Sequence, residues 1–358
     1  ISLQTPVSDT GRLRLWKDIC TMVSVKRQAE GVYRRMQSRT LVIKGKGGLG
    51  NRILSAISGL VYADLSGRKP VIDWRDGSYA PLGENAYPLL FQSPIGGEAI
   101  GAATMDDGAD VCPPIWAGNL HRQPQDMIDT YMPRSHSNPW GYRRLCVELK
   151  RLDQTQAVAV YWSYLPKLGR MRQHLRRDAR FAKRGEREVF ANYLGRYFTP
   201  NARVRHALSH MRPTAKLPSI GVHIRFTDRK IPLGPVLKTL EQLKARHPNA
   251  TIFLATDSAE IEDRLKRAFD KVITHPKRLG LAGARLHGPD TTCNPLQEAE
   301  NALIDMWQLS RCDHLIYSRR STFSVTSGYL GRFAPARIHD VERYSPTLWA
   351  KELLQRYA

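Results

Sequence analysis

The stretch that decides the fold runs from residue 219 to residue 228 and reads Ser-Ile-Gly-Val-His-Ile-Arg-Phe-Thr-Asp. Its apolar part predicts a strand that delivers its chemistry at the carboxyl end, where open α/β sheets bind ligands. His223 and Arg225 are two residues apart, so they project to the same side of an extended chain. Asp228 follows just past the strand. Because an arginine fork holds phosphate oxygens in a bidentate manner, the stretch suits a dianionic leaving group, although a solvated Arg–Asp ion pair is the structural alternative.

The charge of the chain predicts an anionic partner. The 358 residues include 55 basic and 33 acidic side chains, which give a net charge of +22. With 42% apolar and 25% charged residues the chain is globular, and its length favours two domains. Nucleic acid, an acidic membrane surface, an anionic polymer and a nucleotide-sugar all fit this charge. Because no nucleic-acid-binding motif is present, we expect no specific nucleic-acid partner.

Cysteine usage and hydropathy bear on the cellular location. The five cysteines are too widely spaced for a zinc site or a small disulfide framework, which favours a reducing cytoplasm; they are Cys20, Cys112, Cys146, Cys293 and Cys312. The sequence contains no run of 18 or more apolar residues, which is the length that a helix needs to span a bilayer. Residues 11–38 predict a basic amphipathic helix that either packs on the following domain or lies on an anionic membrane. We expect a bacterial cytoplasmic protein, free or peripheral to the inner membrane, or a Golgi-lumen protein if it is eukaryotic and an anchor has been removed.

Strands and helices alternate along most of the chain, which predicts an α/β fold with parallel, doubly wound sheets. We expect a basic helical segment at 1–40, an acceptor-side α/β domain at 41–205 and a nucleotide-sugar-binding α/β domain at 206–358. In the second domain the expected strands are 219–225, 251–256, 272–274 and 314–317, and the expected helices are 234–245, 260–269, 296–310 and one from about 322. In the first domain we expect strands from 41, at 70–74 and at 157–162, a helix at 51–65, long loops at 76–140, a basic helical stretch at 165–197 and a connection at 200–213.

A glycine turn follows the first strand and has two interpretations. Residues 45–50, Gly-Lys-Gly-Gly-Leu-Gly, match G-x-G-x-x-G, and Asp73 ends the next strand where a ribose-binding acid would stand, so an NAD(P)-dependent oxidoreductase is one alternative. The glycines by themselves indicate only close approach of backbone amides to an anion or sugar, at the positive end of a helix. A tight corner that binds nothing is the structural alternative, because glycine is common in such corners.

Four ordered blocks between about residues 41 and 335 resemble the GDP-fucose-dependent fucosyltransferases, a superfamily with plant xyloglucan, α1,2, α1,6 (core and nodulation-factor) and protein O-fucosyltransferase members. Residues 47–52 resemble its first block, and residues 221–228 resemble its His-x-Arg-x-x-Asp donor motif. The remaining blocks are 253–258 and 305–324. Residues 1–40 and 76–215 match no block, and they include the parts that would define an acceptor.

The resemblance implies a GT-B-type architecture of two Rossmann-like domains and an inverting transfer of fucose from GDP-fucose to a hydroxyl of a glycan or glycolipid. It implies that Arg225 grips the diphosphate and that Asp228 keeps the end of its strand in shape. The implied donor-binding residues are His223, Arg225, Asp257, Ser258, Asp305, Ser321, Thr322 and Phe323. The residues expected on the acceptor side of the cleft are Gly48, Asn51, Arg52, Asp76 and Glu84. Asp257 has an alternative role as the N-cap of the helix at 260–269.

The sequence also bears on whether the reaction needs a metal ion and on which residue acts as the general base. No Asp-x-Asp pair occurs in the chain, so we expect no metal and no cofactor, with cationic side chains in the metal's place. Core α1,6 enzymes of the resembled family carry a glutamate five residues after the motif aspartate, but Leu233 stands there in this chain. Either Asp76 or Glu84 removes the acceptor proton, or leaving-group stabilisation supplies most of the catalysis. A non-catalytic basic protein that binds anionic glycan or nucleic acid is the second alternative to the transferase.

Overall fold

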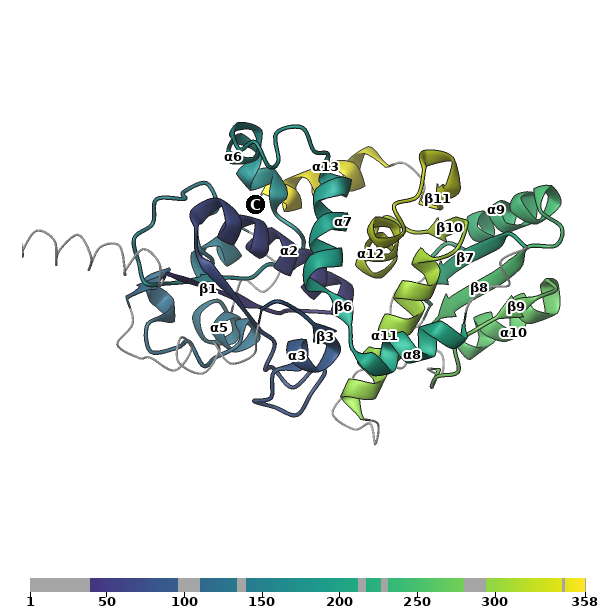
Figure 1. The fold of residues 1–358 in the computed structure, drawn as a ribbon, viewed down its shortest axis with the longest axis horizontal. Helices are drawn as coiled ribbons and strands as arrows, with labels where there is room; N and C mark the ends of the chain where they lie inside the picture. The colour runs from purple at the N-terminus through teal and green to yellow at the C-terminus, as the bar shows by residue number, and fades with distance from the viewer. Residues whose placement is uncertain are drawn as a thin grey trace, which may run out of the picture.

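The computed structural model is an α/β protein built around two parallel sheets (Figure 1). It describes residues 39–95, 110–133, 140–211, 217–226, 231–279, 294–342 and 345–357. The basic helix expected at 11–38 and the motif residue Asp228 lie outside the described residues.

The first sheet comes from the N-terminal half of the chain. Its parallel strands lie in the order β2 (Lys69–Asp73), β1 (Thr40–Lys44), β5 (Val158–Tyr161) and β4 (Val111–Cys112). Helix α2 (Leu49–Ser66) connects β1 to β2, and almost all of its residues are buried. Because α2 follows the carboxyl end of β1 after a short glycine turn, its N-terminus lies at the edge of the sheet where ligands bind in such folds.

The second sheet has β7 (Ser219–Ile224), the strand of the first motif, at its centre. The strand order is β11 (Ile338–Asp340), β10 (His314–Tyr317), β7, β8 (Thr251–Thr256) and β9 (Val272–Ile273), all parallel. All six residues of β7 are buried, as its near-continuous apolar run predicts for a central parallel strand. The helices of this half are α9 (Leu233–Arg246), α10 (Ala259–Ala268), α11 (Pro295–Ser310) and α12 (Thr322–Gly331).

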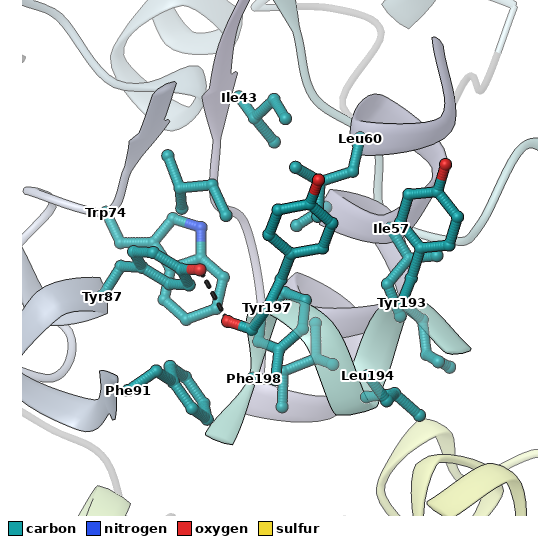
Figure 2. Packing of buried hydrophobic residues seen from close by; sticks show 14 of the residues in the cluster. Ile43, Ile57, Leu60, Trp74, Tyr87, Phe91, Tyr193, Leu194, Tyr197 and Phe198 are labelled. Carbon is teal, nitrogen blue, oxygen red and sulfur yellow. Dashed lines mark hydrogen bonds between the residues drawn. The ribbon is translucent and has the colours of Figure 1, made fainter. Parts of the chain in front are cut away.

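The largest apolar core joins the two halves. Figure 2 shows its aromatic part, in which the Tyr87 hydroxyl donates a hydrogen bond of 2.6 Å to the Tyr197 carbonyl. Leu303 and Ile304 of α11 belong to the same core as Ile57 of α2. Helices α11 and α12 therefore lie directly against the helices of the N-terminal half (Figure 1).

Several predicted segments differ from the structure. The helical stretch expected at 165–197 is divided into η4 (Leu168–Met171), α6 (Arg172–Arg177) and α7 (Glu186–Tyr197). The connection expected at 200–213 contains α8 (Ala202–His210), which starts at Asn201 because that side chain accepts a hydrogen bond from the Val204 N–H. The loops expected at 76–140 contain short elements, of which the two helices have N-terminal caps: α3 (Ala86–Leu90), β3 (Phe91–Gln92), β4, η2 (Pro114–Trp116) and α5 (Pro124–Tyr131).

The remaining elements are short or lie at the periphery. Strand β3 pairs antiparallel with β6 (Thr199–Pro200), and single 3-10 turns form η3 (Gly141–Leu145) and η5 (Pro335–Arg337). The last helix, α13 (Pro346–Tyr357), contacts η4, so it lies against the N-terminal half (Figure 1). The domain limits 41–205 and 206–358 stay a prediction. Among the described helices, none is long and apolar enough to cross a membrane.

Candidate active site

A cavity lies between the two halves, at the carboxyl ends of β7 and β8 and beside the glycine turn. Many of the expected site residues line it: Gly48, Asn51, His223, Arg225, Asp257, Asp305, Thr322 and Phe323. The other lining residues are Leu49, Gly50, Tyr79, Ala255, Thr256, Lys277, Arg278, Glu298, Asn301 and Ala302. Residues that are far apart in sequence thus meet at one site, where open α/β sheets bind ligands.

The N-termini of two helices meet at this cavity. Helix α2 begins after Gly48 and helix α12 begins after Ser321, and neither N-cap makes a side-chain hydrogen bond to the first turn. Neither helix has an acidic residue in its first turn. The Ser321 hydroxyl is buried and has no hydrogen-bond partner within the described part of the chain. Backbone N–H groups and the positive ends of both helix dipoles therefore favour an anion here.

Three cationic side chains line the same cavity. Arg225 lies at the carboxyl end of β7, one residue past the strand instead of within it as predicted, and Lys277 and Arg278 follow β9 in the chain. The two residues after β9 were missed by the sequence analysis, since they lie in an irregular segment without periodicity. The feature of the sequence that could have indicated them is a pair of adjacent basic residues shortly after a strand of the parallel sheet. Together with the two helix ends, these cations can neutralise a multiply charged group such as a diphosphate.

His223 is a neutral group in this site. Its ring is buried and stacks on the ring of Phe323, with the centroids 4.8 Å apart and the planes at 23°. The pKa of His223 is lowered to about 3, mainly because the ring is buried and also because the positive charges of Lys277 and Arg225 lie nearby. Its Nδ1 atom is buried and meets no hydrogen-bond partner among the described residues. His223 can thus donate or accept one hydrogen bond to a ligand without adding charge.

Asp305 presents a buried carboxylate to the cavity. Its Oδ2 atom accepts a hydrogen bond from Lys277, and its buried Oδ1 atom has no partner in the described structure. Burial raises the pKa of this carboxyl group, against the opposing charge of Lys277. A buried acceptor that lacks a donor costs free energy, so Oδ1 suits a ligand N–H group.

Asp257 lies at the cavity as expected, whereas Ser258 does not. Asp257 lines the cavity and its Oδ1 atom accepts a hydrogen bond of 2.7 Å from the Phe226 backbone N–H, which ties the ends of β7 and β8 together. Ser258, not Asp257, is the N-cap of α10, and its hydroxyl accepts from the Ile261 N–H. The alternative of Asp257 as a helix cap is therefore wrong, while Ser258 serves the helix and does not line the cavity.

A hydrogen bond joins the two helix starts across the cavity wall. The Thr322 hydroxyl donates to Asn51 Oδ1 over 2.7 Å, and the Asn51 amide donates to the Tyr164 carbonyl over 2.8 Å. Asn51 was expected on the acceptor side and Thr322 on the donor side. Because these side chains bond to each other, they hold the starts of α2 and α12 together, and both also line the cavity.

The remaining acceptor-side residues do not line the cavity. Arg52 is buried and holds Asp76 through two hydrogen bonds of 3.0 and 2.5 Å, and its Nε atom donates to the Gly47 carbonyl. Burial acts to raise the pKa of Asp76, but the hydrogen bonds and charge of Arg52 outweigh it and leave the pKa lowered. Glu84 is exposed on a turn. Neither Asp76 nor Glu84 lines the cavity.

The glycines of the G-x-G-x-x-G turn face protein atoms. A Cβ atom on Gly45 would meet the Trp74 ring at 2.7 Å, and one on Gly50 would meet the backbone of Phe323 at 2.6 Å. Gly47 has a φ of +78°, and a Cβ atom there would meet the Tyr164 ring at 2.8 Å. These three glycines thus serve internal packing, and at Gly47, the position where a dinucleotide-binding turn brings its backbone close to a pyrophosphate, the near neighbour is the Tyr164 ring.

Comparisons with known proteins place the fold. No protein-family model and no curated protein matches the chain. Among solved structures, NodZ α-1,6-fucosyltransferase soaked with GDP-fucose matches 82% of this chain and 92% of its own, with 22% identity and a TM-score of 0.59. The fucosyltransferase NodZ from Bradyrhizobium matches 81% of this chain and 92% of its own, with 22% identity and a TM-score of 0.56. This likeness confirms the expected α/β fold of GT-B type, with two Rossmann-like parallel sheets.

Proposed function

We propose that the protein is an inverting, metal-independent fucosyltransferase that transfers L-fucose from GDP-fucose to a hydroxyl group of a glycan or glycolipid. The observation that carries this proposal is the convergence of two helix N-termini, neither with a cap hydrogen bond from its N-cap side chain, and three cationic side chains on one cavity. The likeness in fold to a fucosyltransferase that was soaked with GDP-fucose supports the choice of donor.

The donor diphosphate would lie between Arg225 and the starts of α2 and α12. Arginine can hold two phosphate oxygens at once, and backbone N–H groups at the helix ends can donate to others. The carboxylate of Asp305, whose Oδ1 lacks a donor within the described residues, would accept from N–H groups of guanine. Adenine offers a different donor pattern, so this contact would favour GDP over an adenine nucleotide.

Bond cleavage would depend on stabilisation of the leaving GDP. As the bond between fucose and phosphate breaks, negative charge grows on the diphosphate, and Arg225 with Lys277 and Arg278 would neutralise it. These cations would supply the charge that a divalent metal supplies in other transferases. Asp228 lies outside the described residues, and its proposed role is to keep the chain at the carboxyl end of β7 in shape.

The acceptor would enter from the side of the glycine turn, near Gly48. A general base is not assigned: Asp76 is bound by Arg52 and has a lowered pKa, and Glu84 is exposed. We therefore favour the interpretation in which leaving-group stabilisation supplies most of the catalysis, because loss of a base costs about 100- to 10,000-fold and is tolerable. Cytoplasmic location stays a prediction.

Ligand-dependent thermal unfolding tests this proposal against its two alternatives. At about 100 times its Kd a ligand adds about 2.7 kcal/mol of stability, which is easily measured. GDP and GDP-fucose should raise the melting temperature of the parent protein, and NAD should not. Stabilisation by NAD alone would favour the oxidoreductase, and salt-sensitive binding of polyanions without any GDP effect would favour a basic binding protein. GDP release from GDP-fucose across a panel of acceptor glycans then tests transfer itself.

A further inference from the structure

Helix α13 leaves large apolar side chains partly exposed. Trp349, Leu353, Leu354 and Tyr357 are 52%, 40%, 57% and 42% exposed, respectively. At 100° per residue these four positions fall within about 140° of the helix surface, so they form one face, which we call the α13 apolar face. Helices on a protein surface usually direct such residues inward. An outward apolar face of this kind indicates contact with another apolar phase or molecule.

The α13 apolar face lies beside a strongly basic segment. Helix α13 contacts η4, where the Tyr357 ring packs against Gly169, and α6 follows η4 directly (Figure 1). Seven exposed basic residues occupy positions 172–187, and we call them the α6 basic segment: Arg172, Arg176, Arg177, Arg180, Lys183, Arg184 and Arg187. Arg180 and Arg184 make ion pairs with Asp178 and Glu188.

The three arginines of α6 itself, Arg172, Arg176 and Arg177, make no ion pair with any described residue. Their charges are therefore available to an external anion. Two features bind a helix to the surface of an anionic bilayer: exposed apolar side chains, and arginines and lysines beside them.

We propose that the α13 apolar face and the α6 basic segment together dock the protein on an anionic lipid bilayer. The apolar side chains enter the boundary between headgroups and acyl chains, and the arginines contact lipid phosphates. Charge decides against a second copy of the chain as the occupant. A symmetric dimer through this face would bring two α6 basic segments together, and each chain already carries a net charge of +22.

Vesicle binding by the full chain tests the proposal. The parent protein should bind vesicles that contain phosphatidylglycerol, should bind phosphatidylcholine vesicles much more weakly, and should be released by salt. The variant Leu353→Asp/Leu354→Asp should lower the partition coefficient by about 30-fold, because two half-exposed leucines no longer enter the bilayer. Arg176→Gln/Arg177→Gln should lower it by about 25-fold, since each arginine near an anionic surface contributes roughly fivefold.

Matched controls separate this surface from general effects. Leu82→Asp changes an 83% exposed leucine on the loop after β2, and Lys238→Gln/Arg246→Gln removes two charges from α9; both should bind vesicles like the parent. Melting temperatures and near-UV circular dichroism check that each variant is folded. Brominated lipid should quench tryptophan fluorescence in the parent, and Trp349→Phe should remove most of that quenching.

Three outcomes overturn the proposal. The first is parental binding by the folded Leu353→Asp/Leu354→Asp variant, which would place the contact elsewhere, for example in residues 1–38. The second is equal binding to phosphatidylcholine and phosphatidylglycerol vesicles. The third is a parent dimer in sedimentation equilibrium that the leucine variant dissociates while vesicle binding is absent, which would assign the face to a second copy.

Discussion

Gly50→Ala should destabilise the protein, although the same change in an ordinary helix stabilises it. Gly50 lies in the first turn of α2, where alanine is normally favoured over glycine by about 0.5–1 kcal/mol. Here the new Cβ atom would stand 2.6 Å from the Phe323 N atom and 2.6 Å from the Thr322 carbonyl carbon, at the start of α12. These are backbone atoms, so no side-chain rotation relieves the contact.

The expected loss follows from this geometry. To reach an ordinary contact of 3.4 Å, the start of α12 must retreat by about 0.8 Å. Overpacking of this kind costs about 1–3 kcal/mol, and the gain in helix propensity offsets part of it, which leaves a net loss of about 1–2 kcal/mol. For a chain of 358 residues we expect the melting temperature to fall by about 1–3 °C. Because both helix starts line the cavity, turnover should fall about 10- to 100-fold.

Gly48→Ala is the matched control in the same turn. Gly48 has an extended backbone (φ −66°, ψ 166°), and the nearest atom to a new Cβ would be Asn51 Oδ1 at 3.9 Å. The melting temperature of this variant should stay within about 1 °C of the parent. Differential scanning calorimetry and a GDP-release assay measure both variants. A Gly50→Ala protein that is as stable as the parent, or more stable, would refute the reasoning.

Three further predictions concern the chemistry of the site. Arg225→Ala should lower turnover by about 100- to 1,000-fold with little change in melting temperature; near-parental turnover in a folded variant would contradict its role at the diphosphate. Transfer should continue in excess EDTA, and a loss that Mn²⁺ or Mg²⁺ restores would count against cationic side chains as the leaving-group stabilisers. Because the folded pKa of His223, about 3, lies below its unfolded value near 6.5, its neutral form stabilises the protein fully above pH 6.5 and this contribution is lost as the pH falls towards 3. His223→Asn should flatten that acid limb in urea unfolding between pH 6.5 and 4, and an unchanged slope would show that another group causes it.

The sequence predicted the central features of the fold because they depend on strong local patterns. Strands β8 and β10 begin and end at the predicted residues, and β7 differs only at Arg225, which follows it. A buried parallel strand is a continuous apolar run, so its limits are readable. Helix α8 and the break between α6 and α7 were not predicted, since short elements held by caps and turns leave little periodicity in the sequence.

Side-chain partners explain what the sequence could not predict at the site. The glycine turn and Asn51 are at the cavity as expected, but Arg52 and Asp76 pair with each other, which no spacing along the chain reveals. Lys277 reaches Asp305 from an irregular segment 28 residues earlier. Contacts of this kind depend on the tertiary fold, because residue types alone do not fix which ion pairs form.

The hydrogen bond from Thr322 to Asn51, with the close approach at Gly50, has a consequence for motion. The starts of α2 and α12 are bonded and in backbone contact, and the largest core continues from Ile57 to Leu303 across the same boundary. A wide hinge opening at this point would break the hydrogen bond and expose core side chains to water. Entry of a substrate and release of a product would thus require movement of the surrounding loops, and the two halves should unfold together in one cooperative transition.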